Sequence, residues 1–193
     1  MKDNYSDIEL ISKVLEGDKP SYALLMKRHQ RFVFTLALRF SRSREDAEEI
    51  AQDCFIKAFR SLHNFKQTSK FSTWLYSIVY TTSMTFLRKK RLDTQSIDDE
   101  GSILQLENHI SDMRADDIEN KSKMVFVNRA IDQLMPDDAA IITLFYKGEQ
   151  SLEEIGQVLG MEANTVKVKL HRARHRLKDK IENILHHEVR ELL

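Results

Sequence analysis

The chain has 193 residues, and its 30 lysines and arginines balance 30 aspartates and glutamates, so its formal net charge is zero. Only 5 glycines and 2 prolines are present, and few stretches alternate between polar and apolar residues, which argues against a β-sheet protein. Hydrophobic residues make up 41% of the chain, enough for a packed core and too many for a disordered protein. We therefore expect an all-α fold of one large or two small domains.

No apolar run is long enough to form a membrane helix, and no leader with an apolar centre and a cleavage site is present. The single cysteine, Cys54, excludes an internal disulfide and is typical of proteins in a reducing cytoplasm. It lies on an apolar helical stripe, so we expect it to be buried rather than to act as a nucleophile. These features predict a cytoplasmic protein without membrane insertion.

The first two predicted helices follow each other closely. Ser6 and Glu9 form a capping box, which marks a helix start, and the helical period continues until Gly17. Pro20 favours the first turn of the next helix, along which apolar residues recur at helical spacing. His29 falls on that apolar face with no partner at metal-ligand spacing, so we expect a packed or half-exposed side chain rather than a metal ligand.

A third helix is predicted over residues 45–62, with Cys54 among its apolar positions. Its other face carries acids that include Asp46, Glu49 and Asp53. From the pattern alone, an ordinary solvated face is the favoured interpretation. Nothing in an exposed stripe raises the pKa of these carboxylates, so acid–base catalysis is not expected.

Residues 64–91 combine aromatic and basic side chains. A polar loop, 66–70, leads into a helix rich in aromatic residues that ends in four consecutive bases, 88–91. Aromatic rings and cations together suit single-stranded nucleic acid, because bases stack on rings and phosphates meet cations. The alternative is that the aromatic residues belong to the core. We favour the core for Trp74 and Leu75, and a binding function for the loop and the basic end.

The balanced net charge hides a segregation of charge along the chain. Residues 93–120 contain nine acidic residues and one arginine, between the basic run 88–91 and a later basic helix. Residues 93–117 have no sustained apolar period and predict a flexible acidic linker. We therefore expect two small helical domains that face nucleic acid, over residues 1–92 and 118–193.

The second domain is predicted to begin with a helix whose inward face is formed by Met124, Val127, Ile131 and Leu134. Pro136, followed by Asp137 and Asp138, marks the start of the next helix, because proline is tolerated there and acids favour the positive end of the helix dipole. Gly148 is expected to end it.

Residues 151–180 predict a helix-turn-helix. Ser151 and Glu154 form a capping box, Gly160 suits a left-handed helix end, and Asn164 is the expected N-cap of a second helix. Six bases and no acid lie between residues 164 and 178 (Lys167, Lys169, Arg172, Arg174, Arg176 and Lys178). The alternative is a charged helix that only packs on a core. The capping box, the turn and the cationic face together favour a helix placed in the DNA major groove.

Near the C-terminus, His186-His187-Glu188 could suggest a metal site. The sequence offers no second pair of ligands for it, and we interpret these residues as the end of a helix. No metal and no cofactor are expected.

Three segments resemble motifs of one family, in that family's order and spacing. They are DAEEIAQDCFIKAF (46–59), FSTWLYSIV (71–79) and EEIGQVLGMEANTVKVKLHRARHRL (153–177). With these residues the chain resembles bacterial RNA polymerase sigma factors of the extracytoplasmic-function (ECF) group over essentially its whole length. The resemblance implies a transcription initiation factor, not an enzyme, that binds core RNA polymerase and directs it to promoters.

The resemblance also implies roles for individual residues. The third helix resembles the surface that docks on the polymerase β′ subunit, with the docking residues Asp46, Glu49, Gln52 and Asp53, and the β subunit is expected as a further contact. The loop from Phe65 to Phe71 resembles the segment that captures a base flipped out of the promoter −10 element. The full −10 set is Phe65, Lys66, Lys70, Phe71, Trp74, Thr81, Arg88, Lys89, Lys90 and Arg91.

The −35 set implied by the resemblance lies on the basic helix and consists of Thr165, Lys167, Val168, Lys169, His171, Arg172, Arg174 and Arg176. Of these, Lys167, Val168, His171 and Arg172 match positions that face the −35 element. Lys169, Arg174 and Arg176 are better placed for phosphates or partner contacts. The acidic linker resembles the segment that runs toward the RNA exit path of polymerase.

The chain departs from the family at Thr81 and Thr85, where the family often has Asn and Asp, so the base read at −10 stays open. The expected partners are core polymerase, promoter DNA and a separate anti-sigma factor. The alternative function is a free-standing helix-turn-helix regulator. Such a regulator would bind duplex DNA alone and would not need the aromatic −10 segment.

Overall fold

The computed structural model describes residues 5–94 and 115–191, with side chains over 5–92 and 124–186. Throughout these ranges the secondary structure is helical and no strand is present, which confirms the all-α prediction. Residues 95–114, most of the predicted acidic linker, lie outside the described residues. None of the described helices combines the length and the apolar character needed to cross a bilayer.

The first helical unit consists of α1 (Asp7–Leu15), α2 (Lys19–Ser41), α3 (Arg44–Ser61), the 3-10 turn η1 (Leu62–Asn64) and α4 (Phe71–Thr94). The predicted capping box starts α1: the Ser6 hydroxyl accepts from the Glu9 amide at 3.3 Å, and the Glu9 carboxylate accepts from the Ser6 amide at 2.6 Å. Arg42 ends α2 in the left-handed conformation, with a φ of 57°, and Ser43 then caps α3. Local polar signals therefore set the helix ends of this unit.

Two polar side chains in the core of the first unit behave as the sequence predicted. His29 is buried, and its Nε2 lies 2.8 Å from a carboxylate oxygen of Asp7. Burial alone would raise the pKa of Asp7, but hydrogen bonds and charge from His29 and Arg28 hold it below its usual value. Cys54 is fully buried, and burial raises the pKa of its thiol to about 12, so the thiolate is not available as a nucleophile.

The second unit consists of α5 (Ala115–Asp132), α6 (Pro136–Tyr146), α7 (Leu152–Leu159) and α8 (Ala163–Glu191). Pro136 stands in the first turn of α6, and the capping box of Ser151 and Glu154 starts α7, as predicted. Gly160 ends α7 in the left-handed region with a φ of 66°, where a side chain would be strained. Helices α7 and α8 therefore form the predicted helix-turn-helix.

Two local predictions about the second unit were wrong. Helix α8 begins at Ala163, because the Val166 amide already donates to the Glu162 carbonyl at 3.0 Å, so Asn164 lies inside the first turn and is not the N-cap. Met124 is 52% exposed and does not belong to the core face of α5. The rest of that face is buried or half-buried, and Ile131 and Leu134 pack in the core.

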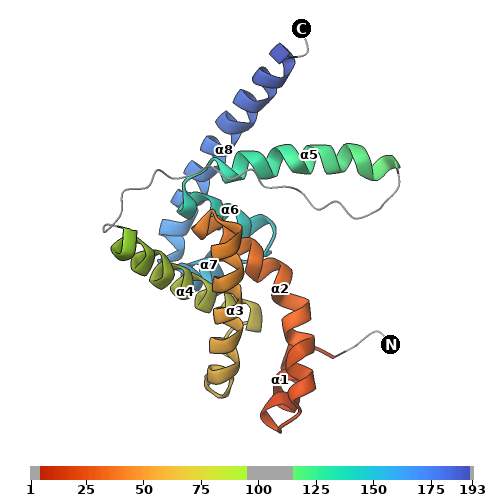
Figure 1. Ribbon diagram of the computed structural model, residues 1–193, viewed down its shortest axis with the longest axis vertical. Coiled ribbons are helices and arrows are strands. Elements are labelled where there is room, and N and C mark those ends of the chain that lie inside the picture. The colour runs from red at the N-terminus through yellow and green to blue at the C-terminus, as the bar shows by residue number, and fades with distance from the viewer. Residues whose placement is uncertain (1–4, 95–114, 192–193) are drawn as a thin grey trace.

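The two units pack against each other along an interface that we call the seam. Helix α7 lies on α4 and α6 lies on α2 (Figure 1), and one hydrophobic cluster contains buried residues of both units. Gly148, just after α6, permits the close approach, because a Cβ there would lie 2.8 Å from Cζ of Phe32 and 2.7 Å from the carbonyl oxygen of Leu144. Helix α8 extends beyond the body of the molecule toward the C-terminus (Figure 1).

Candidate nucleic-acid interface

The predicted docking residues share one face of α3. Glu49, Gln52 and Asp53 are exposed. Asp46 is half-buried, because its carboxylate accepts a hydrogen bond from Nζ of Lys90 at 2.7 Å. Ile56 is exposed one turn beyond Gln52 and Asp53, so the acidic face continues into an apolar patch. Sequence reasoning missed Ile56, although its spacing of three and four residues from the acids was the available signal.

The aromatic residues predicted for −10 recognition form a packed cluster. Phe65 and Phe71 are 9% and 5% exposed, and their ring centroids lie 5.8 Å apart in an edge-on arrangement. Trp74 is half-buried, with its ring centroid 5.3 Å from that of Phe65. His29 meets the Phe71 ring edge-on at 5.3 Å. In this structure the three rings therefore pack against one another at the base of the loop, and their faces are largely covered.

The outer surface of the same loop is polar. Lys66 and Lys70 are exposed, and Gln67 bends the loop with a φ of 56°. On α4, Thr81 is exposed, and its hydroxyl donates to the Ser77 carbonyl at 2.9 Å. Of the described residues predicted for −10 recognition, the exposed ones are therefore the two loop lysines, Thr81 and the basic run 88–91.

The loop predicted to recognise the −10 element contacts the helix-turn-helix. Nζ of Lys70 lies 3.0 Å from the carboxylate of Glu154, the residue that completes the α7 capping box. Burial alone would raise the pKa of Glu154, but the Ser151 amide and Lys70 outweigh it and hold that pKa below its usual 4.5. The buried hydroxyl of Thr73 donates to the side-chain oxygen of Gln150 at 2.8 Å, and Gln150 is itself buried. The sequence predicted neither the Lys70–Glu154 ion pair nor the Thr73–Gln150 hydrogen bond.

A second group of polar contacts joins α2 to α5 and to the turn after α5. Arg39 is 6% exposed and pairs with the carboxylate of Asp132, while Oδ1 of Asn128 lies 3.3 Å from the same guanidinium. Burial lowers the pKa of Arg39 to about 10, so it stays charged at neutral pH. Arg42 donates to the Leu134 carbonyl at 2.6 Å. The seam therefore contains buried charge as well as apolar surface.

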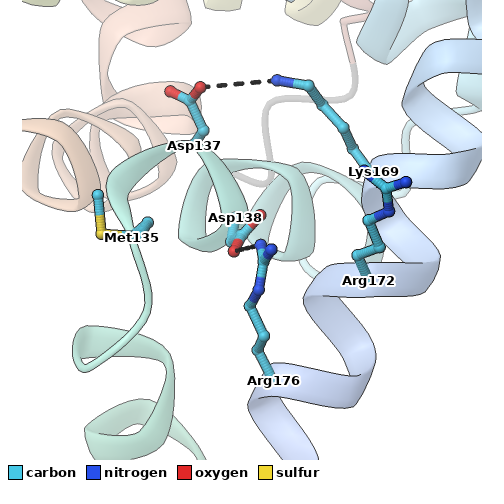
Figure 2. Close-up of a pocket in the computed structure, with 6 residues that line it drawn as sticks. All are labelled: Met135, Asp137, Asp138, Lys169, Arg172 and Arg176. Carbon is cyan, nitrogen blue, oxygen red and sulfur yellow. Dashed lines mark hydrogen bonds and ion pairs between the residues drawn. The ribbon is translucent and has the colours of Figure 1, made fainter.

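On α8 the predicted −35 residues fall into two groups. Thr165, Lys167, Val168, His171 and Arg172 are exposed. The other three are cations that contact α6, and of these Arg174 and Arg176 are also exposed. Lys169 lies 3.7 Å from Asp137, and Arg176 donates to the buried Asp138 at 2.5 Å (Figure 2). The Arg174 guanidinium lies 5.0 Å from the ring centroid of Phe145. The sequence signalled Asp137 and Asp138 only as favourable helix-start acids. In the structure they also position α8.

Arg172 lines a pocket between α6 and α8, together with Met135 and the two ion pairs (Figure 2). Its side chain lies between Lys169 and Arg176 along the same helix face. Because Asp137 and Asp138 compensate those two neighbours, Arg172 contributes the uncompensated positive charge of this pocket. It is therefore well placed to meet an anion or a base edge.

Comparison with known proteins identifies two family regions in the chain. Residues 25–92 match the family Sigma-70 region 2, and residues 127–177 match Sigma-70, region 4. The chain is 30% identical to the RNA polymerase sigma-H factor of Pseudomonas aeruginosa, over 93% of this chain and 95% of that protein. It is also 30% identical to the ECF RNA polymerase sigma-E factor of Escherichia coli K12, over 96% of this chain and 99% of that protein.

Two solved structures share the fold. CnrH, in complex with the cytosolic domain of CnrY, matches with a TM-score of 0.63 and 19% identity, over 92% of this chain and 97% of that one. The sigma factor RpoE of Bartonella quintana, in complex with the anti-sigma factor NepR, matches with a TM-score of 0.69 and 20% identity. The match covers 83% of this chain and 96% of that one. These two structures show the fold, and the full-length relatives with the two family regions show the family: the chain belongs to the ECF RNA polymerase sigma factors.

Proposed function

We propose that this ECF sigma factor divides promoter recognition between its two helical units. Residues 1–92 bind core polymerase and the −10 element, residues 118–193 bind the −35 element, and residues 93–117 join them. The observation that carries this proposal is the presence of separate exposed cationic surfaces on the two units, together with an exposed acidic face on α3.

The acidic face of α3 is the proposed docking site for core polymerase. Glu49, Gln52 and Asp53 offer exposed polar groups, and Ile56 adds apolar area beside them. Charged groups around an apolar patch favour correct orientation and fast association. Asp46 has a different role in this scheme, because its pairing with Lys90 ties the docking face to the basic end of α4.

At −10 the loop from Phe65 to Phe71 captures an unstacked base. The packed rings beneath it keep the loop preformed, so less binding energy is lost in ordering it, while Lys66 and Lys70 meet the phosphates. Extrusion of a base costs a few kcal/mol, and a preformed pocket offsets that cost. Thr81 lies along α4 from this loop and is the nearest exposed candidate for reading the base.

At −35 the exposed residues of α8 read base edges in duplex DNA. Lys167, His171 and Arg172 are the proposed base-reading side chains, with Val168 as an apolar contact, and each good base contact discriminates by about 1–3 kcal/mol. Lys169, Arg174 and Arg176 are already engaged with α6. Their proposed role is to fix the helix and to approach phosphates, without reading the sequence.

The closed seam holds the two units in direct contact, whereas the two promoter elements are well separated along DNA. The elements lie about 25 base pairs apart, which is about 85 Å of B-DNA at about 3.4 Å per step. In the structure Thr73 of the first unit and Gln150 of the second are 2.8 Å apart. We infer that the two units separate when the protein joins polymerase and promoter, and that Lys70 is freed from Glu154 in that step.

The factor performs no chemistry of its own in this proposal, and it acts in the cytoplasm with the polymerase. The RpoE structure contains an anti-sigma factor, and we propose that a partner of this class regulates the present chain. Such a partner would act by holding the two units or by covering the α3 face.

The test is reconstitution with core RNA polymerase that lacks any initiation factor, on a pool of genomic fragments. We expect start-site-specific transcripts that require this protein, and their aligned upstream sequences give its −35 and −10 elements. Core binding without specific transcripts would contradict the assignment of the DNA surfaces. Tight duplex binding without core binding would favour the free-standing regulator.

A further inference from the structure

Two histidines lie side by side on the exposed surface of α8. His171 and His175 are separated by four residues, which places both side chains on one face of a helix. Their Nε2 atoms are 3.4 Å apart, and their ring centroids are 4.6 Å apart. Nothing in the fold requires this pairing, because both rings are exposed.

We propose that His171 and His175 form a two-ligand site for Zn²⁺ or another divalent transition metal ion that prefers imidazole. Zn–N bonds of about 2.0–2.1 Å at tetrahedral angles place two ligating nitrogens about 3.3–3.4 Å apart. The two Nε2 atoms already have this separation, so binding needs little rearrangement of either side chain. Imidazole nitrogen is a preferred ligand of zinc, nickel and copper, and the spacing of four residues on a helix is the one that zinc-binding His pairs use.

The protonation of the pair is compatible with a metal ion. The two Nε2 atoms lie 3.4 Å apart, and a hydrogen bond between neutral rings at this distance would use a single proton and leave one ring with its lone pair toward the other. Binding moves the remaining proton to Nδ1 of its own ring or to solvent, and both Nε2 atoms then face the ion. No redox step and no covalent change are involved.

The site is open on its other sides. The described residues contain no group of three or more His, Cys, Asp and Glu side chains arranged around a common metal position, so water or an outside donor completes the coordination. Lys167, Arg172, Arg174 and Lys178 lie on the same helix and oppose a further positive charge. Asp137 and Asp138 of α6 partly offset this by pairing with Lys169 and Arg176.

One consequence rests on the proposed function. If α8 reads the −35 element, an ion held by His171 and His175 adds positive charge and open coordination positions to the DNA-facing side of the helix. Phosphate oxygens and the N7 atoms of purines could then complete its coordination. Zn²⁺ would in that case strengthen −35 duplex binding by the wild-type protein and have no such effect on His175→Ala.

The direct test titrates the untagged full-length protein with Zn²⁺ alone and follows the ¹⁵N resonances of the histidine side chains. We expect a saturable one-to-one shift at Nε2 of His171 and of His175, which His171→Ala and His175→Ala each abolish. His186→Ala is the matched control, since it removes an exposed histidine of the same helix, and it should bind as wild type does. Circular dichroism would show that α8 is intact in each variant.

Unmoved Nε2 resonances in the wild type would overturn the proposal, whatever the variants do. It would also be overturned if either Ala variant at the pair bound Zn²⁺ as well as wild type, or if His186→Ala lost binding. Duplex binding by fluorescence anisotropy, measured with the protein bound to core polymerase, separates the two claims. Zn²⁺ binding without any duplex binding would support the metal site and refute the −35 role of α8. Duplex binding without Zn²⁺ binding would support the −35 role and refute the metal site.

Discussion

The substitution Asp132→Ala tests whether buried charge holds the two units together. Arg39 of α2 is almost completely buried and pairs with the carboxylate of Asp132 at the end of α5. Because burial lowers the pKa of Arg39 only to about 10, the guanidinium keeps its charge at neutral pH when its partner is removed. The variant therefore leaves a buried cation with only the neutral Asn128 oxygen, 3.3 Å away, in place of the carboxylate.

The size of the effect follows from this geometry. Removing one partner of a buried ion pair costs about 3–5 kcal/mol when both groups are deeply buried. The side chain of Asp132 is 30% exposed and Asn128 remains in place, so we expect about 2 kcal/mol, close to the value of one charged hydrogen bond. When the units separate, Arg39 meets water and the penalty disappears. The equilibrium between closed and open forms should therefore shift about 30-fold toward the open form.

The assay measures the distance between the two units by single-molecule fluorescence energy transfer. Dyes are attached at Arg60→Cys on α3 and Lys178→Cys on α8, both at exposed positions. Cys54 should not react, because it is fully buried and its thiol has a raised pKa. In Asp132→Ala the low-transfer population should grow relative to the parent protein.

A matched control comes from an exposed ion pair. Glu48→Ala breaks the ion pair between Nε of Arg44 and the carboxylate of Glu48, which lie 3.0 Å apart. Both side chains are more than half exposed, and exposed pairs of this kind stabilise a protein by at most about 0.5 kcal/mol. It should leave the transfer efficiency unchanged. An Asp132→Ala protein with the distance distribution of the parent, but a lower free energy of unfolding, would refute the reasoning, since the pair would then stabilise the fold and not the seam.

Arg172→Ala should weaken −35-dependent transcription by about 5- to 150-fold, because it removes one base contact of about 1–3 kcal/mol. It should leave core binding intact. The control Lys178→Ala should change transcription and core binding little. Charge reversal at Asp53 should lower the affinity for core polymerase in a pull-down titration. Glu16→Lys, at the exposed end of α1, should not. Equal affinities for Asp53→Lys and the parent protein would remove the α3 face from the docking site. The closed form should also weaken at acid pH. Because the pKa of Glu154 is held below 4.5, its ion pair contributes above that pH and is lost as the pH falls through the lowered value. The dependence of energy transfer on pH should therefore be weaker in Glu154→Gln than in the parent protein.

Short-range signals in the sequence predicted most of the fold. The two capping boxes place a hydroxyl and a carboxylate three residues apart, and Gly160 needs only its own backbone angle, so each can be recognised without tertiary structure. The spacing of apolar residues likewise predicted the helices and the all-α class. The boundary at Ala163 was missed because Asn164 is a good cap by residue type, while the backbone hydrogen bond from Val166 to Glu162 decides the helix start.

The seam could not be predicted in the same way. Arg39 and Asp132 are separated by 93 positions, and nothing in the local pattern of either residue indicates the other. The aromatic residues show a related limit. A ring that stacks on a base and a ring that packs in a core have the same hydrophobicity and spacing, so the burial of Phe65 and Phe71 had to come from the structure.

The contact of Gly148 with Phe32 has a consequence for sequence evolution. The two positions belong to different units, yet any side chain at 148 would meet the ring of residue 32 as well as the Leu144 carbonyl. In ECF sigma factors that share this closed form, a residue larger than glycine at 148 should be rare, and where it occurs it should be accompanied by a smaller residue at 32. A chain with a larger residue at 148 and a full-sized ring at 32 would be one whose two units do not rest against each other.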